Sequence, residues 1–203
     1  VKPMDLDYIK AVRDVCDEFG LLMFLDEIQC GMGRTGKLFA HEWAGVKPDI
    51  VASAKGLGGG FPVGACLATE KAAAGMIAGS HGSTFGGNPL AVAAINAVLD
   101  VMLQDGFLPQ VEKMGKLLRD KLETVAARHP KVLAGVRGSG LMLGLRCVAP
   151  NGDVVAALQK NGMLTVPAGD NIVRLLPPLV LEPQHVEEAI GILDRTCMEL
   201  AAA

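Results

Sequence analysis

The chain has 203 residues, enough for one large domain or two small ones, and half of them are hydrophobic. Aromatic residues make up only 4%, and the mean hydropathy is +0.35, so we expect a sizeable and mostly aliphatic core. The net charge of −3 and the pI near 5.8 exclude the basic surface that is typical of proteins that bind nucleic acid or anionic membranes.

The five cysteines have no CxxC spacing, which predicts reduced thiols in a cytoplasmic protein. No apolar run approaches the roughly 18 residues of a membrane-spanning helix. Residues 1–5 also lack the apolar segment of a signal peptide. The chain opens without Met on a short connector that leads at once into a helix, so we expect it to be a piece of a longer protein.

The first half of the chain alternates between helical and extended patterns. Apolar side chains at spacings of three and four predict an amphipathic helix over residues 5–19. The apolar run at 21–25 does not alternate, which predicts a strand buried on both faces. Further elements follow in the order of a glycine loop at 31–36, a short helix at 38–43, strands at 50–53 and 64–68, and one or two helical turns over 71–77. This order predicts a mostly parallel sheet with helices on its faces.

The second half begins with two helices and then changes character. Residues 89–103 are apolar on nearly every side, which predicts a helix buried between layers, and residues 108–128 predict a longer amphipathic helix. An α+β unit follows, with strands at 132–137, 141–146, 163–166 and 172–175 and helices at 153–160 and 183–200. We therefore predict an α/β fold in three parts: a sheet domain over 1–104, a connecting helix over 105–130 and a small α+β domain over 131–203.

Lys55 directly follows the strand at 50–53 and precedes the glycine-rich run 56–60. Ligands of open α/β sheets bind beyond the carboxyl ends of the strands, and glycines let a planar ligand approach the backbone. An amine in this place suits a Schiff base with an aldehyde cofactor, although a lysine after a strand is otherwise an ordinary solvated loop residue. A P-loop is excluded, because its glycines precede the lysine.

Asp26 ends the run at 21–25, and two interpretations of its carboxylate stay open. It forms a salt bridge or a helix cap, or it faces the cationic ring nitrogen of a ligand. If the two strands are neighbours, Asp26 and Lys55 can reach one ligand. Residues 31–36 match GxGxxG, but other residues separate them from the strand and no long helix follows. Turn chemistry is therefore favoured over a nucleotide-binding module, which remains the alternative class of function.

Two further segments carry candidate ligand-binding residues. In the loop at 80–89, Ser83, Thr84 and backbone N–H groups can bind a phosphate or a carboxylate, while Asn88 predicts a capped helix start. Arg174 lies within an apolar strand and needs a partner, which is either a structural carboxylate or the carboxylate of a substrate. The four histidines lack metal-ligand spacing, so we predict no metal site.

These segments, in this order, resemble the class III pyridoxal-phosphate-dependent aminotransferases, and within that class the acetylornithine aminotransferases most of all. The resemblance spans nearly the whole chain and rests on Leu25–Gln29, Gly31–Gly36, Pro48–Ile50, Ala54–Gly60, His81–Pro89 and Arg174–Pro178. The phosphate-binding glycine loop, the ring-stacking aromatic residue and a further substrate arginine of the family do not occur here. The chain therefore resembles the C-terminal half of such an enzyme.

The resemblance implies a fold of type I, in which residues 1–104 belong to the large pyridoxal phosphate-binding domain. Lys55 would hold the cofactor as a Schiff base and then move the proton as a general base. Asp26 would pair with the pyridine nitrogen and keep the ring an electron sink. Gln29 would lie near the phenolic oxygen of the cofactor.

The resemblance also implies a homodimer that shares its site between subunits. Thr84 would bind the cofactor phosphate of the neighbouring subunit, Ser83 would contact substrate, and Arg174 would hold the α-carboxylate of an amino acid or of 2-oxoglutarate. The implied reaction moves an amino group from N-acetylornithine to 2-oxoglutarate in arginine biosynthesis. Enzymes for succinylornithine, ornithine and 4-aminobutyrate share these motifs and stay open as alternatives, as does an inactive fragment. No nucleic acid or membrane partner is implied.

Overall fold

The computed structural model describes residues 1–202 and divides the chain into two compact units. One unit is Met4–Leu108, and the other joins Val1–Pro3 to the part of the chain that begins at Pro109. The first unit is a mixed sheet with helices and the second an antiparallel sheet with helices, which confirms the predicted α/β class. No single helix within residues 1–202 is long and apolar enough to cross a membrane. One bent pair of helices, Pro89–Met102 with Phe107–Arg128, reaches the required length and composition when the two are taken together.

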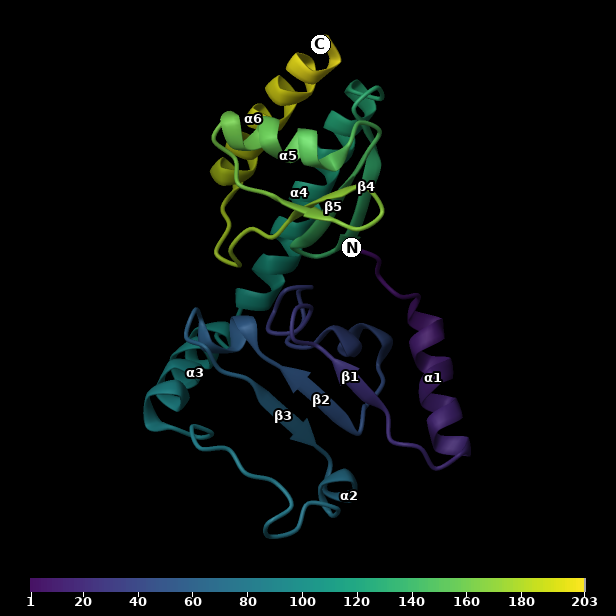
Figure 1. Ribbon diagram of the computed structural model, residues 1–203, viewed down its shortest axis with the longest axis vertical. Coiled ribbons are helices and arrows are strands. Elements are labelled where there is room, and N and C mark those ends of the chain that lie inside the picture. Colours follow the sequence, from purple (N-terminus) through teal and green to yellow (C-terminus); the bar gives the residue numbers. More distant parts are fainter. Residues whose placement is uncertain (203) are drawn as a thin grey trace. The chain divides into compact units, whose positions relative to one another are not determined.

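The unit Met4–Leu108 contains a three-stranded sheet in the order β1-β2-β3 (Figure 1). Strands β1 and β2 are parallel, whereas β2 and β3 are antiparallel. The elements of this unit are α1 (Leu6–Glu18), β1 (Phe24–Asp26), the 3₁₀ helix η1 (Ala40–Ala44), β2 (Ile50–Ser53), the 3₁₀ helix η2 (Lys55–Gly58), β3 (Ala65–Ala68), α2 (Glu70–Ala73) and α3 (Pro89–Met102). Because β1 and β2 run the same way, the residues that follow them meet at one edge of the sheet.

The prediction of a fully buried strand over residues 21–25 is wrong. Strand β1 starts only at Phe24, whose side chain is 57% exposed, and Leu21 and Leu22 are exposed as well, while Met23 alone in this stretch is buried. The reason is that β1 is an outer strand, bonded to β2 and to no other strand of the described residues. An apolar run indicates that a segment suits burial, but burial itself depends on what packs on both of its sides.

Helix α3 corrects the sequence prediction in the same way. It is capped by Asn88, whose Oδ1 accepts the Ala91 N–H at 2.9 Å, as the sequence predicts. However, only Ala91 and Met102 are buried, and Leu90 is 66% exposed. Every residue of β3 is exposed too. The unit therefore presents apolar surface on two of its elements.

This exposed apolar surface predicts that the chain, produced by itself, associates with copies of itself. Sedimentation at micromolar concentration should give species larger than the 21.2 kDa monomer. Replacing Phe24 and Leu90, which are both exposed in the structure, with serine should lower the fraction of associated chains. The control is serine at Leu164 in the other unit, where the leucine is 84% exposed and lies outside the apolar surface of this unit. A single species of monomer mass for the unmodified chain would contradict the prediction.

Helix α1 is fastened to the sheet by an ion pair that the sequence does not reveal. Nη1 of Arg13 lies 2.7 Å from Oδ2 of Asp49, and the same carboxylate oxygen accepts the Met23 N–H at 2.8 Å. Both side chains are largely buried, so this contact is worth more than a surface pair. The hydrogen bonds from Arg13 and Met23 lower the pKa of Asp49 below its ordinary value. One carboxylate thus joins α1, the entry to β1 and the start of β2.

From the ion pair of Asp49 we predict that the free energy of unfolding depends on pH. Because its pKa is lowered on folding, its contribution is fully present above the ordinary aspartate pKa of about 4 and is lost as pH falls through the lower folded value. Asp49→Asn keeps an acceptor for the Met23 N–H and removes the charge. Its melting temperature should be lower than that of the unmodified protein at pH 7, and the difference should shrink below about pH 4.

The control for this prediction is Asp17→Asn, which removes the other carboxylate that contacts Arg13. Asp17 is 69% exposed, so its pair with Arg13 is screened by water and its loss should change the melting temperature little. Thermal unfolding followed between pH 3 and pH 7 compares the two variants. If the melting temperature of Asp49→Asn stayed below that of the unmodified protein by the same amount over this range, the charge of Asp49 would play no part in stability.

The second unit contains a four-stranded antiparallel sheet in the order β4-β5-β7-β6. Side chains of the two central strands, such as Leu143, Leu145 and Val173, are completely buried. The described elements are α4 (Phe107–Arg128), β4 (Leu133–Ser139), β5 (Met142–Cys147), α5 (Asn151–Lys160), β6 (Val166–Ala168), β7 (Ile172–Leu175) and α6 (Pro183–Ala202). The predicted strand at 163–166 is displaced to 166–168, because pairing with β7 fixes which residues of this segment are extended.

Candidate functional site

Lys55 adopts a left-handed backbone conformation immediately after β2. Its φ is +47°, whereas Ala54 before it is extended. A lysine in this region costs roughly 1–2 kcal/mol relative to an ordinary conformation, and such residues cluster at functional sites. The side chain is exposed, so its amine is accessible to a ligand.

Asp26 ends β1 and Lys55 follows β2, and these two parallel strands are neighbours, which the sequence left open. Asp26 is paired with Ala52 in the β1–β2 ladder, and the Glu27 N–H continues the ladder by donating to the Ala52 carbonyl at 3.0 Å. The exposed carboxylate of Asp26 accepts the Ile28 N–H through Oδ1 at 3.0 Å. The structure therefore brings an accessible amine and an accessible carboxylate to the carboxyl edge of one sheet.

The glycines after Lys55 allow close packing within the chain. A Cβ on Gly58 would lie 2.7 Å from Cγ1 of Val63, and one on Gly59 would lie 2.8 Å from Cγ2 of Val98 in α3. Gly59 also has a φ of +58°. Gly59 lets α3 pack directly on the end of η2, and Gly58 makes room for Val63, so the two positions are explained without a ligand, unlike the role that the sequence suggests.

Glu27, next to Asp26, has a structural role. It is 3% exposed, and its carboxylate accepts the backbone N–H groups of Ala40 and His41 at the start of η1. The His41 ring contributes a further contact, with Nδ1 2.7 Å from Oε1 of Glu27. A buried carboxylate with three partners is fully committed to holding the loop. Gln29, half-buried, lies in the turn that follows Asp26 and Glu27.

The GxGxxG segment at 31–36 forms turns and opens no helix. Its N–H groups are used within the segment: Gly33 donates to the Leu38 carbonyl, Arg34 to Gly31 and Gly36 to Gly33. A dinucleotide site needs such groups directed at a pyrophosphate from a helix N-terminus. The turn interpretation therefore accounts for this segment, and the nucleotide-binding alternative loses its main support.

Cys30 lies in the same turn and is half-buried. Its Sγ lies 3.8 Å from the Asp26 carbonyl oxygen. Burial, followed by the charges of Glu27 and Asp26, raises the pKa of the Cys30 thiol to about 11. The thiol is therefore protonated at neutral pH.

Ser83 and Thr84 lie in the exposed loop before α3. Oγ of Ser83 accepts the Gly86 N–H at 2.9 Å, which shapes the turn that leads to Asn88. Thr84 is exposed, and so is Phe85 beside it. The loop thus has a defined conformation and presents the Thr84 side chain to the exterior of this unit.

Arg174 belongs to the second unit, in the central strand β7. It pairs with Gly144 of β5 on one side and with Val166 of β6 on the other, and it is half-buried. A Cβ on Gly144 would lie 2.7 Å from Cγ2 of Ile172, two residues before Arg174 on the same face. The guanidinium group is therefore carried by a strand whose neighbours on both sides fix its register.

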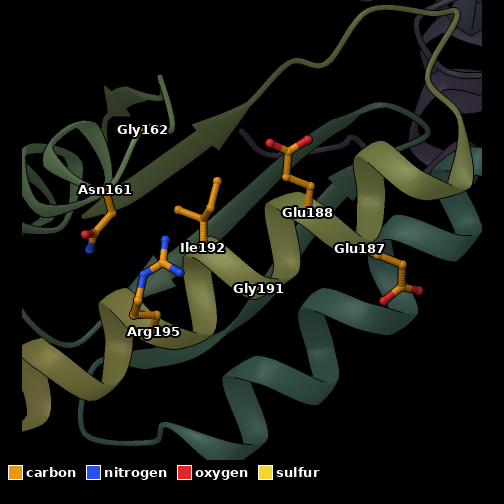
Figure 2. A pocket seen from close by; sticks show the side chains of 7 residues that line it. All are labelled: Asn161, Gly162, Glu187, Glu188, Gly191, Ile192 and Arg195. Atoms are coloured by element: carbon orange, nitrogen blue, oxygen red, sulfur yellow. The ribbon is translucent and has the colours of Figure 1, made fainter.

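A shallow groove on the second unit, between the end of α5 and the middle of α6, contains none of the predicted residues. Figure 2 shows Glu187 and Glu188 pointing in different directions and Asn161 across the groove from Arg195. Glu187 already forms an ion pair with Lys121 at 2.9 Å, and Asn161 donates to α6. Within residues 1–202, no cluster of three or more His, Cys, Asp or Glu side chains is placed to hold a metal ion.

Comparison with known proteins identifies the family. The aminotransferase class-III family matches residues 1–197. The chain belongs to the class III aminotransferases. The chain is 57% identical to acetylornithine aminotransferase 1 of Bradyrhizobium diazoefficiens over 97% of its own length, and 54% identical to the acetylornithine aminotransferase of Mesorhizobium japonicum over all of it. It spans about half the length of these relatives, 48% and 51% respectively.

Solved structures show the same fold. The acetylornithine aminotransferase of Elizabethkingia anophelis superposes with a TM-score of 0.89 at 35% identity, covering 96% of this chain and 50% of that one. The ornithine aminotransferase of Toxoplasma gondii gives a TM-score of 0.90 at 31% identity, covering 96% and 47%, and its structure shows partial occupancy of PLP at the active site. Class III aminotransferases use pyridoxal phosphate. The same fold thus occurs in enzymes named for two different amino donors.

The residues at the carboxyl edge of β1 and β2 fit pyridoxal phosphate by their chemistry. The cofactor has an aldehyde, and the accessible amine of Lys55 is a group that reacts with aldehydes. The cofactor also has a ring nitrogen that is cationic when protonated, and the accessible carboxylate of Asp26 is a group that pairs with such a cation. Asp26 ends β1 and pairs with Ala52 of the adjacent strand β2, and Lys55 follows three residues after Ala52, at the start of η2. The donor set therefore suits this cofactor.

Proposed function

We propose that this chain corresponds to the C-terminal half of an enzyme that moves an amino group from N-acetylornithine to 2-oxoglutarate with the help of pyridoxal phosphate. The observation that carries the proposal is the left-handed, exposed Lys55 at the end of β2, beside Asp26 at the end of β1. The identities of 54–57% to relatives named acetylornithine aminotransferase support the choice of donor. The reaction fits a step of arginine biosynthesis.

Pyridoxal phosphate supplies an aldehyde that bonds an amine and a ring that accepts an electron pair. Lys55 would hold this aldehyde through its side-chain amine and, once released, would act as the general base for the proton on the substrate carbon that bears nitrogen. The Asp26 carboxylate would face the protonated ring nitrogen and stabilise its positive charge. Gln29 would lie near the phenolic oxygen.

The remaining roles concern binding. Arg174 offers a planar fork of N–H donors, which matches the α-carboxylate of an amino acid or of 2-oxoglutarate. Ser83 contacts substrate, and Thr84 binds the cofactor phosphate of the neighbouring subunit in a homodimer. The exposure of both side chains on their own unit supports a function that involves an external ligand. The five free cysteines and the near-neutral charge are compatible with a cytoplasmic homodimer that has no nucleic acid or membrane partner.

A donor panel on the full-length enzyme tests the proposed reaction. N-acetylornithine, succinylornithine, ornithine and 4-aminobutyrate are each supplied with 2-oxoglutarate, and glutamate formation is measured. We expect the highest kcat/KM with N-acetylornithine. A preference for ornithine or 4-aminobutyrate would assign another class III activity, and no turnover with any donor would refute transamination.

The chain produced by itself is expected to be inactive. It carries Lys55 and Asp26, but the phosphate loop and the ring-stacking residue typical of the family do not occur in its sequence. Pyridoxal phosphate is added to the isolated chain, and cofactor binding and glutamate formation are measured. Stoichiometric binding with turnover of N-acetylornithine would show that the 203 residues hold a complete site.

A further inference from the structure

Two asparagines of the second unit, Asn151 and Asn171, join three segments around the strand that carries Arg174. Helix α5 begins at Asn151 after Pro150, and Pro150 provides no side-chain cap. The Asn151 N–H donates instead to Oδ1 of Asn171 at 2.8 Å. The cap of α5 is thus supplied from a residue 20 positions further along the chain, at the start of β7.

Asn171 also holds the end of β5. Its Nδ2 donates to the carbonyl oxygens of Cys147 at 2.8 Å and Ala149 at 2.9 Å, and its own carbonyl accepts the Cys147 N–H at 2.9 Å. Both hydrogens of the side-chain amide and its oxygen are therefore engaged. Asn171 has a φ of +54° and follows Asp170 at +61°, a pair of left-handed residues that turns β6 into β7.

Asn151 fastens both strands of this hairpin. Its Nδ2 donates to the carbonyl oxygens of Ala168 and Ile172, each at 2.9 Å. These two residues are opposite each other in the β6–β7 ladder, at the pair next to the turn. The two side-chain amides thus fix where β6 ends, where β7 begins and how β7 lies against β5.

We propose that Asn171 and Asn151 are positioning residues for Arg174, and this rests on the proposed role of Arg174 in binding a substrate carboxylate. Arg174 is three residues beyond Asn171 on the same strand. A shift of register by one residue would turn its side chain to the opposite face of the sheet. A fork of two parallel hydrogen bonds to a carboxylate tolerates little displacement of the guanidinium. The amide pair keeps β7 in the one register that presents Arg174 to its ligand.

A purely structural role predicts a different result from a positioning role. If the pair only stabilised the second unit, its loss would lower the melting temperature and the fraction of active enzyme, and so the apparent kcat. It would leave the KM for 2-oxoglutarate unchanged in the molecules that fold. A positioning role raises that KM, because the carboxylate meets a displaced guanidinium.

The test uses Asn171→Gly in the full-length enzyme. Glycine accepts the φ of +54° without strain and removes all three side-chain hydrogen bonds. The matched control is Asp170→Gly, in the same turn with a φ of +61°, which loses only an exposed ion pair with Arg137. We expect Asn171→Gly to raise the KM for 2-oxoglutarate about fivefold or more with kcat changed less than about twofold, and Asp170→Gly to change neither.

A double-mutant cycle with Arg174→Ala shows whether the effect passes through Arg174. Arg174→Ala by itself should raise the KM for 2-oxoglutarate, and adding Asn171→Gly should raise it no further. An equal additional increase in the Arg174→Ala background, or no change of KM for Asn171→Gly alone, would overturn the positioning role. A KM left unchanged by Arg174→Ala would overturn the proposed role of Arg174 itself, and the positioning role with it.

A second variant covers the case in which Asn171→Gly does not fold. Asn151→Ala removes the two bonds to the hairpin and keeps the N–H that Asn171 caps. It should raise the KM for 2-oxoglutarate in the same way, again without a further increase in the Arg174→Ala background. A folded Asn151→Ala enzyme with unchanged KM would overturn the proposal.

Discussion

Replacing Lys55 with alanine is expected to abolish transamination by the full-length enzyme. In the proposed function, the change removes both the amine that would bond the cofactor aldehyde and the base that would move the substrate proton. Loss of the general base alone lowers a rate by about 10²–10⁴-fold, so we expect kcat to fall about a thousandfold or more. Alanine is a non-glycine residue like lysine, so the strain at a φ of +47° stays and the fold is retained.

This effect is measured by glutamate formation and by the absorbance of the lysine-bonded cofactor near the edge of the visible range. The control is Lys47→Ala, because Lys47 is also exposed and its backbone carbonyl, which Arg13 contacts, is kept. Lys47→Ala should retain full activity and the absorbance. If the Lys55→Ala enzyme kept either the absorbance of a lysine-bonded cofactor or measurable turnover, Lys55 would not be the cofactor lysine.

Asp26→Asn should lower kcat by about a hundredfold or more, while the fold is preserved. Asparagine keeps an acceptor for the Ile28 N–H, so the turn after β1 stays intact. In the proposed function, the variant loses the negative charge that would hold the ring nitrogen protonated, and removal of one electrostatic contact of this kind costs about 10²–10³ in rate. The effect should fall mainly on kcat, because the charge acts on the reacting ring.

The matched control is Asp14→Asn on α1, which changes an exposed carboxylate away from the strand ends. Steady-state kinetics of both variants, with cofactor content measured for each, separate catalysis from cofactor loss. Asp26→Glu restores the charge with a longer side chain and should recover part of the rate. An Asp26→Asn enzyme as active as the Asp14→Asn enzyme would remove Asp26 from the site.

The sequence predicted the local features of the site well, because they depend on neighbours along the chain. Strand β7 has the predicted limits, which place Arg174 correctly within it. The Asn88 cap of α3 was predicted for the same reason, since a cap and its helix lie within four residues. The sequence left open whether the strands before Asp26 and Lys55 are neighbours, and the β1–β2 pairing shows that they are.

Features that depend on distant segments escaped sequence reasoning. The exposure of Phe24 and Leu90 depends on what lies beside β1 and α3, which composition does not specify. The Asn171–Asn151 pair joins residues 20 positions apart, and its signal is weak: a helix that starts after an uncapping proline, and an Asp-Asn turn between two strands. The Arg13–Asp49 pair spans 36 residues and gave no signal.

The left-handed backbone of Lys55 has an evolutionary consequence. Glycine would relieve the strain at this position and stabilise the fold by about 1 kcal/mol, so selection for stability alone would not retain a lysine there. Under the proposed function, catalysis is the force that keeps the lysine. In lineages where the ancestral gene was duplicated and one copy lost its chemistry, position 55 should drift toward glycine or asparagine, and that drift would mark the inactive copies.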